Sequence, residues 1–459
     1  MNELDNIQLS HFKRAYFIGI GGIGMSALAR YFKTIGWEVA GYDKTRSNLT
    51  DELQKEGISI HFEDLGKEVP VQFQDVNSTL VVYTPAIPKN LGELQVFQAS
   101  NANLFKRSEV LGLLTRQSKS IGVAGTHGKT TTSSMLAHIL NNSSMKCNAF
   151  LGGIATNFNS NLLIHPENQY TVIEADEFDR SFLTLRPFAS IVTSTDPDHL
   201  DVYGEAAEFL EGFQKYTNLI HKNGRLVMKE GLKLTSPAPI ISYAIDSKTA
   251  DYSGDNLRFV NGKFLVDVRT PNTHLQNIEI GIPGIHNAEN AIACIALCEF
   301  LGLSEAEIRN GLATFLGVKR RFEYQIKTEN LVYIDDYAHH PTELHALISS
   351  VRLLYPNKKI TAVFQPHLFS RTRDFFEGFS SELSLVDDLV LLPIYPAREE
   401  PIPGITSDLL LEKISISSKQ LLSPAEALAY LSTKKEGIIL TIGAGDIDRI
   451  VAPLKEALA

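Results

Sequence analysis

The residues best suited to chemistry in this chain lie between an apolar strand, predicted over 121–124, and a helix, predicted over 131–141. Backbone N–H groups at such a strand-to-helix turn point at an anion. Lys129 can reach the outer phosphates of that anion, and the Thr130 hydroxyl can bind Mg²⁺. The turn consists of Gly125, Thr126, His127, Gly128, Lys129, Thr130 and Thr131. It therefore predicts a site for a nucleoside triphosphate and Mg²⁺.

This turn differs from the common phosphate-binding loop in the position of its first glycine. The common loop has a glycine five residues before the glycine of Gly-Lys-Thr, where this chain has Val123, and Gly125 lies only three residues before it. A plain glycine turn with an exposed lysine is the alternative. The coincidence of two glycines, a lysine and two hydroxyls at one junction favours phosphate binding.

A second glycine turn, with Gly19, Gly21 and Gly24, follows a strand predicted over 15–18. The next strand, predicted over 38–42, ends at Asp43, which completes the pattern associated with dinucleotide binding. The geometry requires only a diphosphate at a helix N-terminus and a sugar hydroxyl near an acid, so a UDP-sugar satisfies it as well as NAD. A tight turn without a ligand is a third possibility. The candidate contacts are Gly21, Gly22, Ile23, Gly24 and Asp43.

Length and composition limit the classes of protein to consider. The 459 residues suggest about three domains. A net charge of −10 argues against nucleic acid or an anionic membrane surface as the main partner. Cys147, Cys294 and Cys298 form neither a disulfide framework nor a zinc-finger spacing, and no apolar run is long enough to enter a membrane. A soluble cytoplasmic protein is expected.

Strands alternate with helices throughout, which predicts an α/β fold with mainly parallel sheets. We place domain limits at 1–106, 107–318 and 319–459, with a polar-apolar linker over 106–117. In the third domain, strands are predicted over 331–334, 360–364, 389–392 and 438–442. A helix should begin at Pro341 and pack one apolar face on the sheet. That face carries Leu344, Leu347, Ile348, Val351 and Leu354.

Acidic and imidazole groups follow two strands of the central domain. Glu174 ends the strand predicted over 171–173, and His199 comes shortly after the strand predicted over 190–193. Ligands of open α/β sheets collect at the carboxyl ends of the strands, where the phosphate-binding turn also lies. Helix capping or a solvated loop would explain such residues without a ligand. The neighbouring turn favours a role at a metal site for Glu174 and His199.

Other candidate groups lie on one helix face and at two strand ends of the third domain. Asn287 and Asn290 are three residues apart on a predicted helix and could contact a base edge, although capping explains Asn287 equally well. The turn at 335–341 carries two adjacent histidines beside two aspartates, and the turn at 365–373 carries one histidine and two arginines. Because no spaced His/Glu partner is present on a helix, we expect substrate or nucleotide contacts there rather than zinc.

Several motifs together resemble the Mur ligase family, and they run in order over nearly the whole chain. They lie at 21–26 (GGIGMS), 125–131 (GTHGKTT), 174–177 (EADE), 198–199 (DH), 286–290 (HNAEN), 320–323 (RRFE), 335–343 (DDYAHHPTE) and 395–404 (YPAREEPIPG). The resemblance implies a Rossmann-like domain for a UDP-sugar, a central ATPase domain and a C-terminal Rossmann-like domain. It also accounts for the unusual turn, since the family's loop has this shorter glycine spacing.

The resemblance implies roles for individual residues. Lys129 and Thr130 would hold the terminal phosphates and Mg²⁺, with Glu174 and His199 at metal sites. Asn287 and Asn290 would contact adenine, Arg321 the phosphates and Asp336 the ribose. Tyr337, His339, His367 and Arg371 are similar to residues that line the reacting end and the amino-acid site. The candidate catalytic residues are Lys129, His199, Arg321, His339, His367 and Arg371. Many relatives have arginine where this chain has Leu368.

The activity implied is ATP-dependent joining of L-alanine to UDP-N-acetylmuramate through an acyl phosphate, in peptidoglycan precursor synthesis, by a monomer or homodimer. A ligase of the same family that adds a ready-made tripeptide to the same sugar is the nearest alternative. An NAD-dependent oxidoreductase would explain Gly19, Gly21, Gly24 and Asp43 but not the phosphate-binding turn. A nucleotide-hydrolysing switch or motor is a third class.

Overall fold

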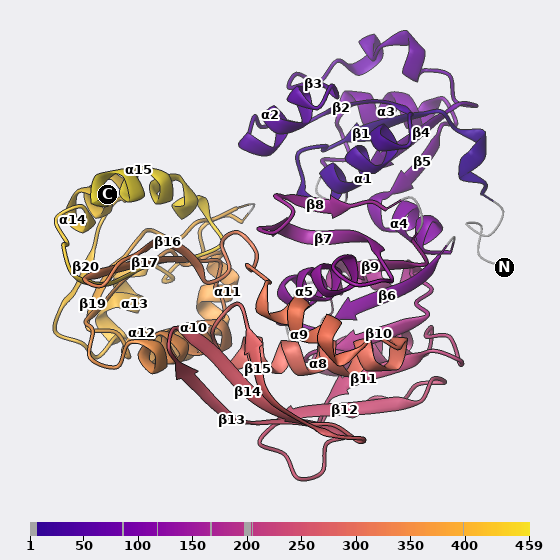
Figure 1. Ribbon diagram of the computed structural model, residues 1–459. Helices are drawn as coiled ribbons and strands as arrows, with labels where there is room; N and C mark the ends of the chain where they lie inside the picture. The colour runs from indigo at the N-terminus through magenta and orange to yellow at the C-terminus, as the bar shows by residue number, and fades with distance from the viewer. Residues whose placement is uncertain are drawn as a thin grey trace. The chain divides into compact units, whose positions relative to one another are not determined.

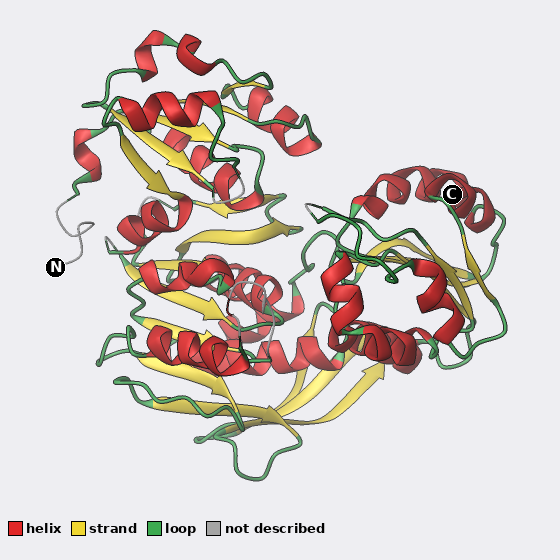
Figure 2. Cartoon of the chain, turned by 180° about the vertical axis from the view of Figure 1, so that it is seen from behind, coloured by secondary structure: helices red, strands yellow, loops and turns green. Residues whose placement is uncertain are grey.

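The computed structural model describes residues 7–84, 87–116, 118–165, 168–196, 203, 205–397 and 399–459 (Figure 1). Contacts group the chain into two compact units. The first contains Met1–Asn256, Val266–Glu279 and Glu289–Phe315, and the second contains Leu257–Leu265, Ile280–Ala288 and Leu316–Ala459. Three sheets with helices packed beside them can be followed in Figure 2. The predicted α/β class is confirmed, whereas the domain limits near 106 and 318 stay predictions.

The N-terminal sheet is parallel, with strand order β3-β2-β1-β4-β5. Its strands are β1 (Arg14–Ile18), β2 (Glu38–Tyr42), β3 (Ser59–His61), β4 (Thr79–Tyr83) and β5 (Asn103–Lys106). Its helices are α1 (Ile23–Thr34), α2 (Asn48–Lys55) and α3 (Gly92–Ala99). Because β1 pairs with β2 on one side and β4 on the other, the chain reverses its direction of winding beside β1. This is the position where open α/β sheets bind ligands.

The central sheet has ten strands in the order β15-β14-β13-β12-β11-β10-β6-β9-β7-β8. These are β6 (Lys119–Ala124), β7 (Cys147–Ala155), β8 (Ser160–Leu163), β9 (Tyr170–Glu174), β10 (Ala189–Val192), β11 (Arg225–Lys229), β12 (Ile240–Ile245), β13 (Tyr252–Val260), β14 (Lys263–Arg269) and β15 (His274–Ile280). Along the sheet, neighbouring strands pair in parallel from β13 through β12, β11, β10, β6 and β9 to β7. The edge strand β8 pairs antiparallel with β7. Its helices are α5 (Lys129–Asn141), α7 (Ala206–Thr217), α8 (Ile285–Leu301), α9 (Glu305–Ala313) and the 3₁₀ helix η5 (Phe178–Thr184).

The linker predicted over 106–117 is wrong, because residues Arg107–Thr115 form helix α4. Its start is capped by the Glu109 carboxylate, which accepts a 2.7 Å hydrogen bond from the Lys106 N–H. Val110, Leu111 and Leu114 are buried. Burial of these side chains stabilises the helix, although the mixed order of apolar and polar residues in its sequence does not indicate a helix.

The C-terminal sheet has the order β16-β17-β21-β18-β19-β20, parallel except for β16. The strands are β16 (Glu323–Lys327), β17 (Leu331–Asp336), β18 (Ile360–Phe364), β19 (Asp388–Leu391), β20 (Lys419–Leu421) and β21 (Gly437–Ile442). The helices are α10 (Pro341–Leu354), α11 (Phe369–Asp374), α12 (Phe376–Leu383), α13 (Ser407–Lys413), α14 (Pro424–Leu431) and α15 (Val451–Leu458). Helix α10 begins at Pro341, and the five apolar side chains predicted to face the sheet are all buried. No helix among the described residues is both long and apolar enough to span a membrane.

Candidate active site

The phosphate-binding turn joins β6 to α5, and its glycines are required by their surroundings. Gly125 has φ +137°, and a Cβ there would lie 2.0 Å from the Thr193 hydroxyl. Gly128 has φ +80°, caps α5, and would place a Cβ 2.9 Å from Asn290 Oδ1. Other side chains are disfavoured at such backbone angles. The shortened loop is thus a tightly packed turn with its first glycine fixed by the neighbouring strand end.

Lys129 is held by a buried carboxylate. Its Nζ donates to Glu177 Oε1 at 2.7 Å and to the Gly125 carbonyl at 2.6 Å. Burial alone would lower the pKa of Lys129, but the carboxylates of Glu177, Asp176 and Glu174 more than offset it and hold the pKa above its usual value. The lysine is therefore a cation at the start of α5, where phosphate groups are also favoured.

Two of the predicted magnesium ligands lie side by side. Thr130 Oγ1 donates to Glu174 Oε1 at 3.1 Å, and Gly152 N–H donates to Glu174 Oε2 at 3.0 Å. A hydroxyl and a carboxylate oxygen beside a phosphate site suit Mg²⁺, which keeps several ligands from water and phosphate. No cluster of three His, Cys, Asp or Glu side chains suited to a metal exists among the described residues. The predicted ligand His199 lies outside the described residues.

The rest of the phosphate-binding turn is fixed by the segment after β10. The Thr126 hydroxyl donates to the Asp196 carbonyl at 2.7 Å, and the His127 N–H donates to Ser194 Oγ at 2.9 Å. His127 Nε2 lies 3.6 Å from an Asp196 carboxylate oxygen. Thr131 is buried in the first turn of α5. Thr126, His127 and Thr131 therefore shape the turn.

The second glycine turn is held in place by hydrogen bonds to Asp43. Gly21 N–H donates to Asp43 Oδ2 at 2.8 Å, and a Cβ on Gly21 would lie equally close to that oxygen. Asp43 Oδ1 accepts from Thr45 N–H at 3.0 Å. Gly22 caps α1, which begins at Ile23. Asp43 thus holds the turn as well as standing where a sugar hydroxyl is predicted.

A hollow of about 270 Å³ joins this glycine turn to the acidic end of β9. Its lining includes Gly22, Ile23 and Gly24 of the glycine turn together with Glu174 and Asp176. A molecule with its diphosphate at the α1 turn can therefore extend toward the phosphate-binding turn. All these residues belong to the first compact unit.

In the second unit, Asp336 ends β17 with both carboxylate oxygens engaged. Oδ2 accepts from Phe322 N–H at 2.6 Å, and Oδ1 accepts from Ala338 N–H at 2.8 Å. Burial raises the pKa of Asp336 to about 6. The Arg321 guanidinium lies 5.3 Å from the centre of the Tyr337 ring and 3.9 Å from Glu343. The segment that carries Arg321, before β16, therefore lies against the turn that follows Asp336 at the end of β17.

His339 and His367 meet between the ends of β17 and β18. Their ring centres are 6.1 Å apart, and the nearest Arg371 nitrogen is 3.3 Å from His367 Nδ1. Burial lowers the pKa of His367 to about 4 and also lowers that of His339. Both rings are therefore neutral at neutral pH. The structure brings the predicted Tyr337, His339, His367 and Arg371 together.

The two predicted adenine contacts have different surroundings. Asn287 is buried, and its Nδ2 donates to the Pro283 carbonyl at 2.6 Å. Asn290, also buried, lies beside Gly128 of the phosphate-binding turn. Asn287 therefore has a local structural partner at the start of α8, while Asn290 is placed next to the predicted nucleotide.

Family models cover nearly the whole chain. The model of the Mur ligase family catalytic domain matches residues 14–119, that of the Mur ligase middle domain 123–298, and that of the Mur ligase glutamate ligase domain 320–445. The chain belongs to the Mur ligase family. The predicted resemblance is confirmed.

Relatives within the Mur ligase family match over the full length. A UDP-N-acetylmuramate–L-alanine ligase of Parabacteroides distasonis is 48% identical over 447 residues, covering 96% of both chains. A crystal structure of UDP-N-acetylmuramate-alanine ligase from Thermotoga maritima aligns with TM-score 0.83 and 27% identity, over 96% of this chain and 98% of that one. A murein peptide ligase from Psychrobacter arcticus, at 22% identity and TM-score 0.69 over 97% and 98% of the two chains, shares the fold.

Two residues of this Mur ligase site were missed by sequence reasoning. Arg107 Nη2 lies 3.3 Å from Asp176, and a Cβ on Gly24 would lie 2.6 Å from Arg107 Nη1. Arg107 directly follows the last strand of the N-terminal sheet, a position that could have indicated a site residue. The wrong assignment of this segment as a linker hid that indication. Glu177 belongs to the Glu-Ala-Asp-Glu motif, but only the structure reveals its pairing with Lys129.

Proposed function

We propose that this protein joins L-alanine to UDP-N-acetylmuramate, with ATP converted to ADP and phosphate. The full-length match to ligases that bear this activity in their name supports the proposal. One observation in the structure carries it further: a single hollow connects the diphosphate-type turn of α1 with Glu174 beside the phosphate-binding turn. A sugar acid and a nucleotide can therefore meet there.

The chemistry requires activation of a carboxylate, because its charge repels an amine and an oxide is a poor leaving group. A lactyl carboxylate oxygen of the sugar would attack the γ-phosphorus of ATP, and the bond to the β–γ bridging oxygen would break, releasing ADP. The amine of L-alanine would then attack the carbonyl carbon and lose a proton, and inorganic phosphate would leave with its bond to carbon broken. Positioning and charge supply most of the catalysis in such phosphoryl transfers.

Lys129 is the residue best placed to offset the repulsion between the two anions. It is a buried cation at the start of α5 with a raised pKa. Its partner Glu177 holds it against the turn, at the level of the Gly125 carbonyl. Thr130 and Glu174 would hold Mg²⁺, which when bound neutralises charge on the phosphates. Arg107 adds a cation to the lining of the hollow, next to both Gly24 and Asp176.

The second unit would serve the nucleoside and the amino acid. Asp336 offers carboxylate oxygens to a ribose, and Arg321 offers a cation to phosphate. The neutral rings of His339 and His367, with Arg371 beside them, suit a small zwitterion whose carboxylate needs a cation and whose amine needs an acceptor.

A phosphate-release assay tests the proposal. Purified protein would receive ATP, Mg²⁺ and UDP-N-acetylmuramate with L-alanine, glycine, L-serine or the tripeptide L-alanyl-γ-D-glutamyl-diaminopimelate. We expect release to require the sugar nucleotide and to be fastest with L-alanine. Preference for the tripeptide would identify the recycling ligase instead, and release without the sugar nucleotide would indicate a switch or motor.

A further inference from the structure

One buried side chain of the hairpin of β7 and β8 forms hydrogen bonds with the helix of the glycine turn. Asn161 of β8 is fully buried. Its Nδ2 donates to the Ile23 carbonyl at 2.6 Å and to Ser26 Oγ at 3.0 Å, and its Oδ1 accepts from Arg30 Nη1 at 2.7 Å. Ile23 is the first residue of α1. Asn161 therefore forms hydrogen bonds with α1 at the end of the helix where the diphosphate is predicted to bind.

The orientation of the Asn161 amide is determined by its partners. A guanidinium has donors only, so the amide oxygen must face Arg30. The amide nitrogen must then face the Ile23 carbonyl, which can only accept. Both polar ends are thus satisfied in a buried position, and neither a carboxylate nor an apolar side chain at this site can reproduce both contacts.

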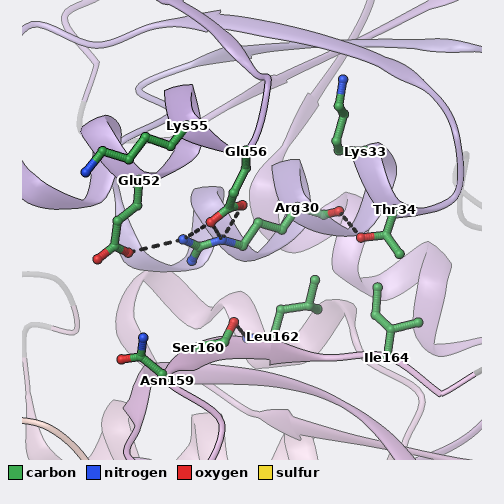
Figure 3. Close-up of a pocket in the computed structure, with 10 residues that line it drawn as sticks. All are labelled: Arg30, Lys33, Thr34, Glu52, Lys55, Glu56, Asn159, Ser160, Leu162 and Ile164. Carbon is green, nitrogen blue, oxygen red and sulfur yellow. Dashed lines mark hydrogen bonds and ion pairs between the residues drawn. The ribbon is translucent and has the colours of Figure 1, made fainter.

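Arg30 extends the same network to α2. Its guanidinium forms hydrogen bonds with Glu56 at 2.7–3.0 Å and with Glu52 at 3.3 Å (Figure 3). A hollow of about 700 Å³ lies beside these groups, with Ser160 and Leu162 of β8 on its other wall. The contact between α1 and β8 beside this hollow is therefore polar and directional, and it adds to the apolar contact of Tyr31 with Phe150.

The other strand of the hairpin reaches the phosphate site. The β7–β8 register shifts between Phe150 and Ala155, so Gly152 lies outside the regular ladder. Its N–H donates to Glu174 Oε2 at 3.0 Å, and a Cβ there would lie 2.3 Å from the same oxygen. One hairpin thus holds the carboxylate beside Thr130 with one strand and the start of α1 with the other.

We propose that Asn161 is a positioning residue for the ligation, which fixes the diphosphate-binding turn relative to Glu174 and the phosphate-binding turn. The inference rests on the proposed function. In-line phosphoryl transfer requires the carboxylate oxygen and the γ-phosphorus to be aligned, and a displacement of about 1 Å can cost about 100-fold in rate. In the proposed function each nucleotide would bind mainly at its own turn, so we expect its affinity to change less than kcat.

The test compares Asn161→Asp with Thr156→Ala, a control at an exposed position of the same hairpin. Asn161→Asp keeps an acceptor for Arg30 and loses the donors to Ile23 and Ser26. We expect kcat to fall about 100-fold, while the dissociation constants of UDP-N-acetylmuramate and ATP, each measured alone by calorimetry, change less than about threefold. An unchanged kcat in folded Asn161→Asp would overturn the inference. So would loss of nucleotide binding in proportion to kcat, which indicates a merely structural role.

A second readout separates this inference from the proposed function. Spin labels at Gln98→Cys on α3 and Lys222→Cys in the central part are exposed, whereas the three native cysteines are buried. We expect the distance distribution between the labels to broaden in Asn161→Asp and not in Thr156→Ala. If the protein has no ligase activity and the distribution still broadens in Asn161→Asp, the proposed function is refuted but the positioning role of Asn161 is retained. An unchanged distribution in Asn161→Asp would refute the positioning role. If Asn161→Asp does not fold, Ser26→Ala removes only one of the contacts of Asn161, together with the hydrogen bond from the Ser26 hydroxyl to the Ile23 carbonyl, and should broaden the distribution to a smaller extent.

Discussion

The phosphate-binding turn after β6 holds Lys129 in a buried ion pair, whereas the turns after β17 and β18 bury two neutral imidazole rings. In the first region, Lys129 is matched by Glu177. In the second, His339 and His367 are neutral at neutral pH. Burial raises the pKa of a carboxyl in each region, Glu177 in the first and Asp336 in the second. Both regions lie at the carboxyl ends of parallel strands. Similar sheet edges thus hold their groups differently, a buried ion pair in one and neutral imidazole rings beside an arginine in the other.

The largest expected effect is that of Lys129→Ala. Removing one preorganised cation costs about 10²–10³-fold in rate, so kcat of ATP-dependent phosphate release should fall at least this far. Lys215→Ala, on the exposed surface of α7, is the matched control and should leave kcat unchanged. Circular dichroism would verify folding of both. Near-normal amide formation by Lys129→Ala would show that the reaction does not require the Lys129 cation.

The next effect concerns the buried partner of that lysine. Glu177→Ala leaves the Lys129 cation without its closest carboxylate, and loss of one member of a buried ion pair costs about 3 kcal/mol. Denaturant unfolding of the first unit should show this loss. Glu211→Ala removes the exposed partner of Lys215 and should not shift the unfolding midpoint. Equal midpoints for the two variants would mean that the Lys129–Glu177 pair contributes nothing to stability.

A smaller effect is expected from His367 in the second region. A lost neutral hydrogen bond is worth about 1 kcal/mol, so His367→Ala should raise KM for L-alanine about fivefold and leave KM for ATP unchanged. His345→Ala, an exposed histidine of α10 paired with Glu382, is the control. A selective rise in KM for ATP would move His367 from the amino-acid site to the nucleotide site.

The smallest effect is a pH dependence. Asp336 has a pKa of about 6, so it ionises as the pH rises through 6 and is protonated below it. Because the pKa of Asp336 is higher in the folded than in the unfolded protein, the protonated form of Asp336 stabilises the folded state at acid pH. This contribution to the free energy of unfolding is lost as the pH rises from about 4 through 6. If the carboxylate binds ribose, KM for ATP should rise a few-fold between pH 7 and pH 5. The rise should disappear in Asp336→Asn; a rise that persists there would assign it to another group.

Local patterns in the sequence predicted much of this fold. The strand over 38–42 and the start of α10 at Pro341 follow from short-range periodicity and proline chemistry, and the structure reproduces both. The glycine turns were predicted for the same reason, since their spacing is local. The rule that ligands gather at strand ends predicted that Glu174 lies near the phosphate-binding turn, and the structure places it in contact with Thr130 of that turn.

Contacts between distant segments were not predictable in this way. Helix α4 has a weak periodic pattern and is stabilised by burial, so it was mistaken for a linker. Glu177 meets Lys129 across 48 positions of sequence, and Asn161 meets Arg30 across 131. Such pairs depend on the order of strands in the sheets. That order is a property of the whole fold rather than of any short segment.

The most direct test of the central claim follows the oxygen atoms of the sugar carboxylate. UDP-N-acetylmuramate labelled with ¹⁸O in both lactyl carboxylate oxygens would be converted with ATP and L-alanine, and the products would be analysed by mass spectrometry. An acyl phosphate predicts one ¹⁸O in the inorganic phosphate and one in the new amide. Amide formation with unlabelled phosphate would exclude an acyl phosphate intermediate.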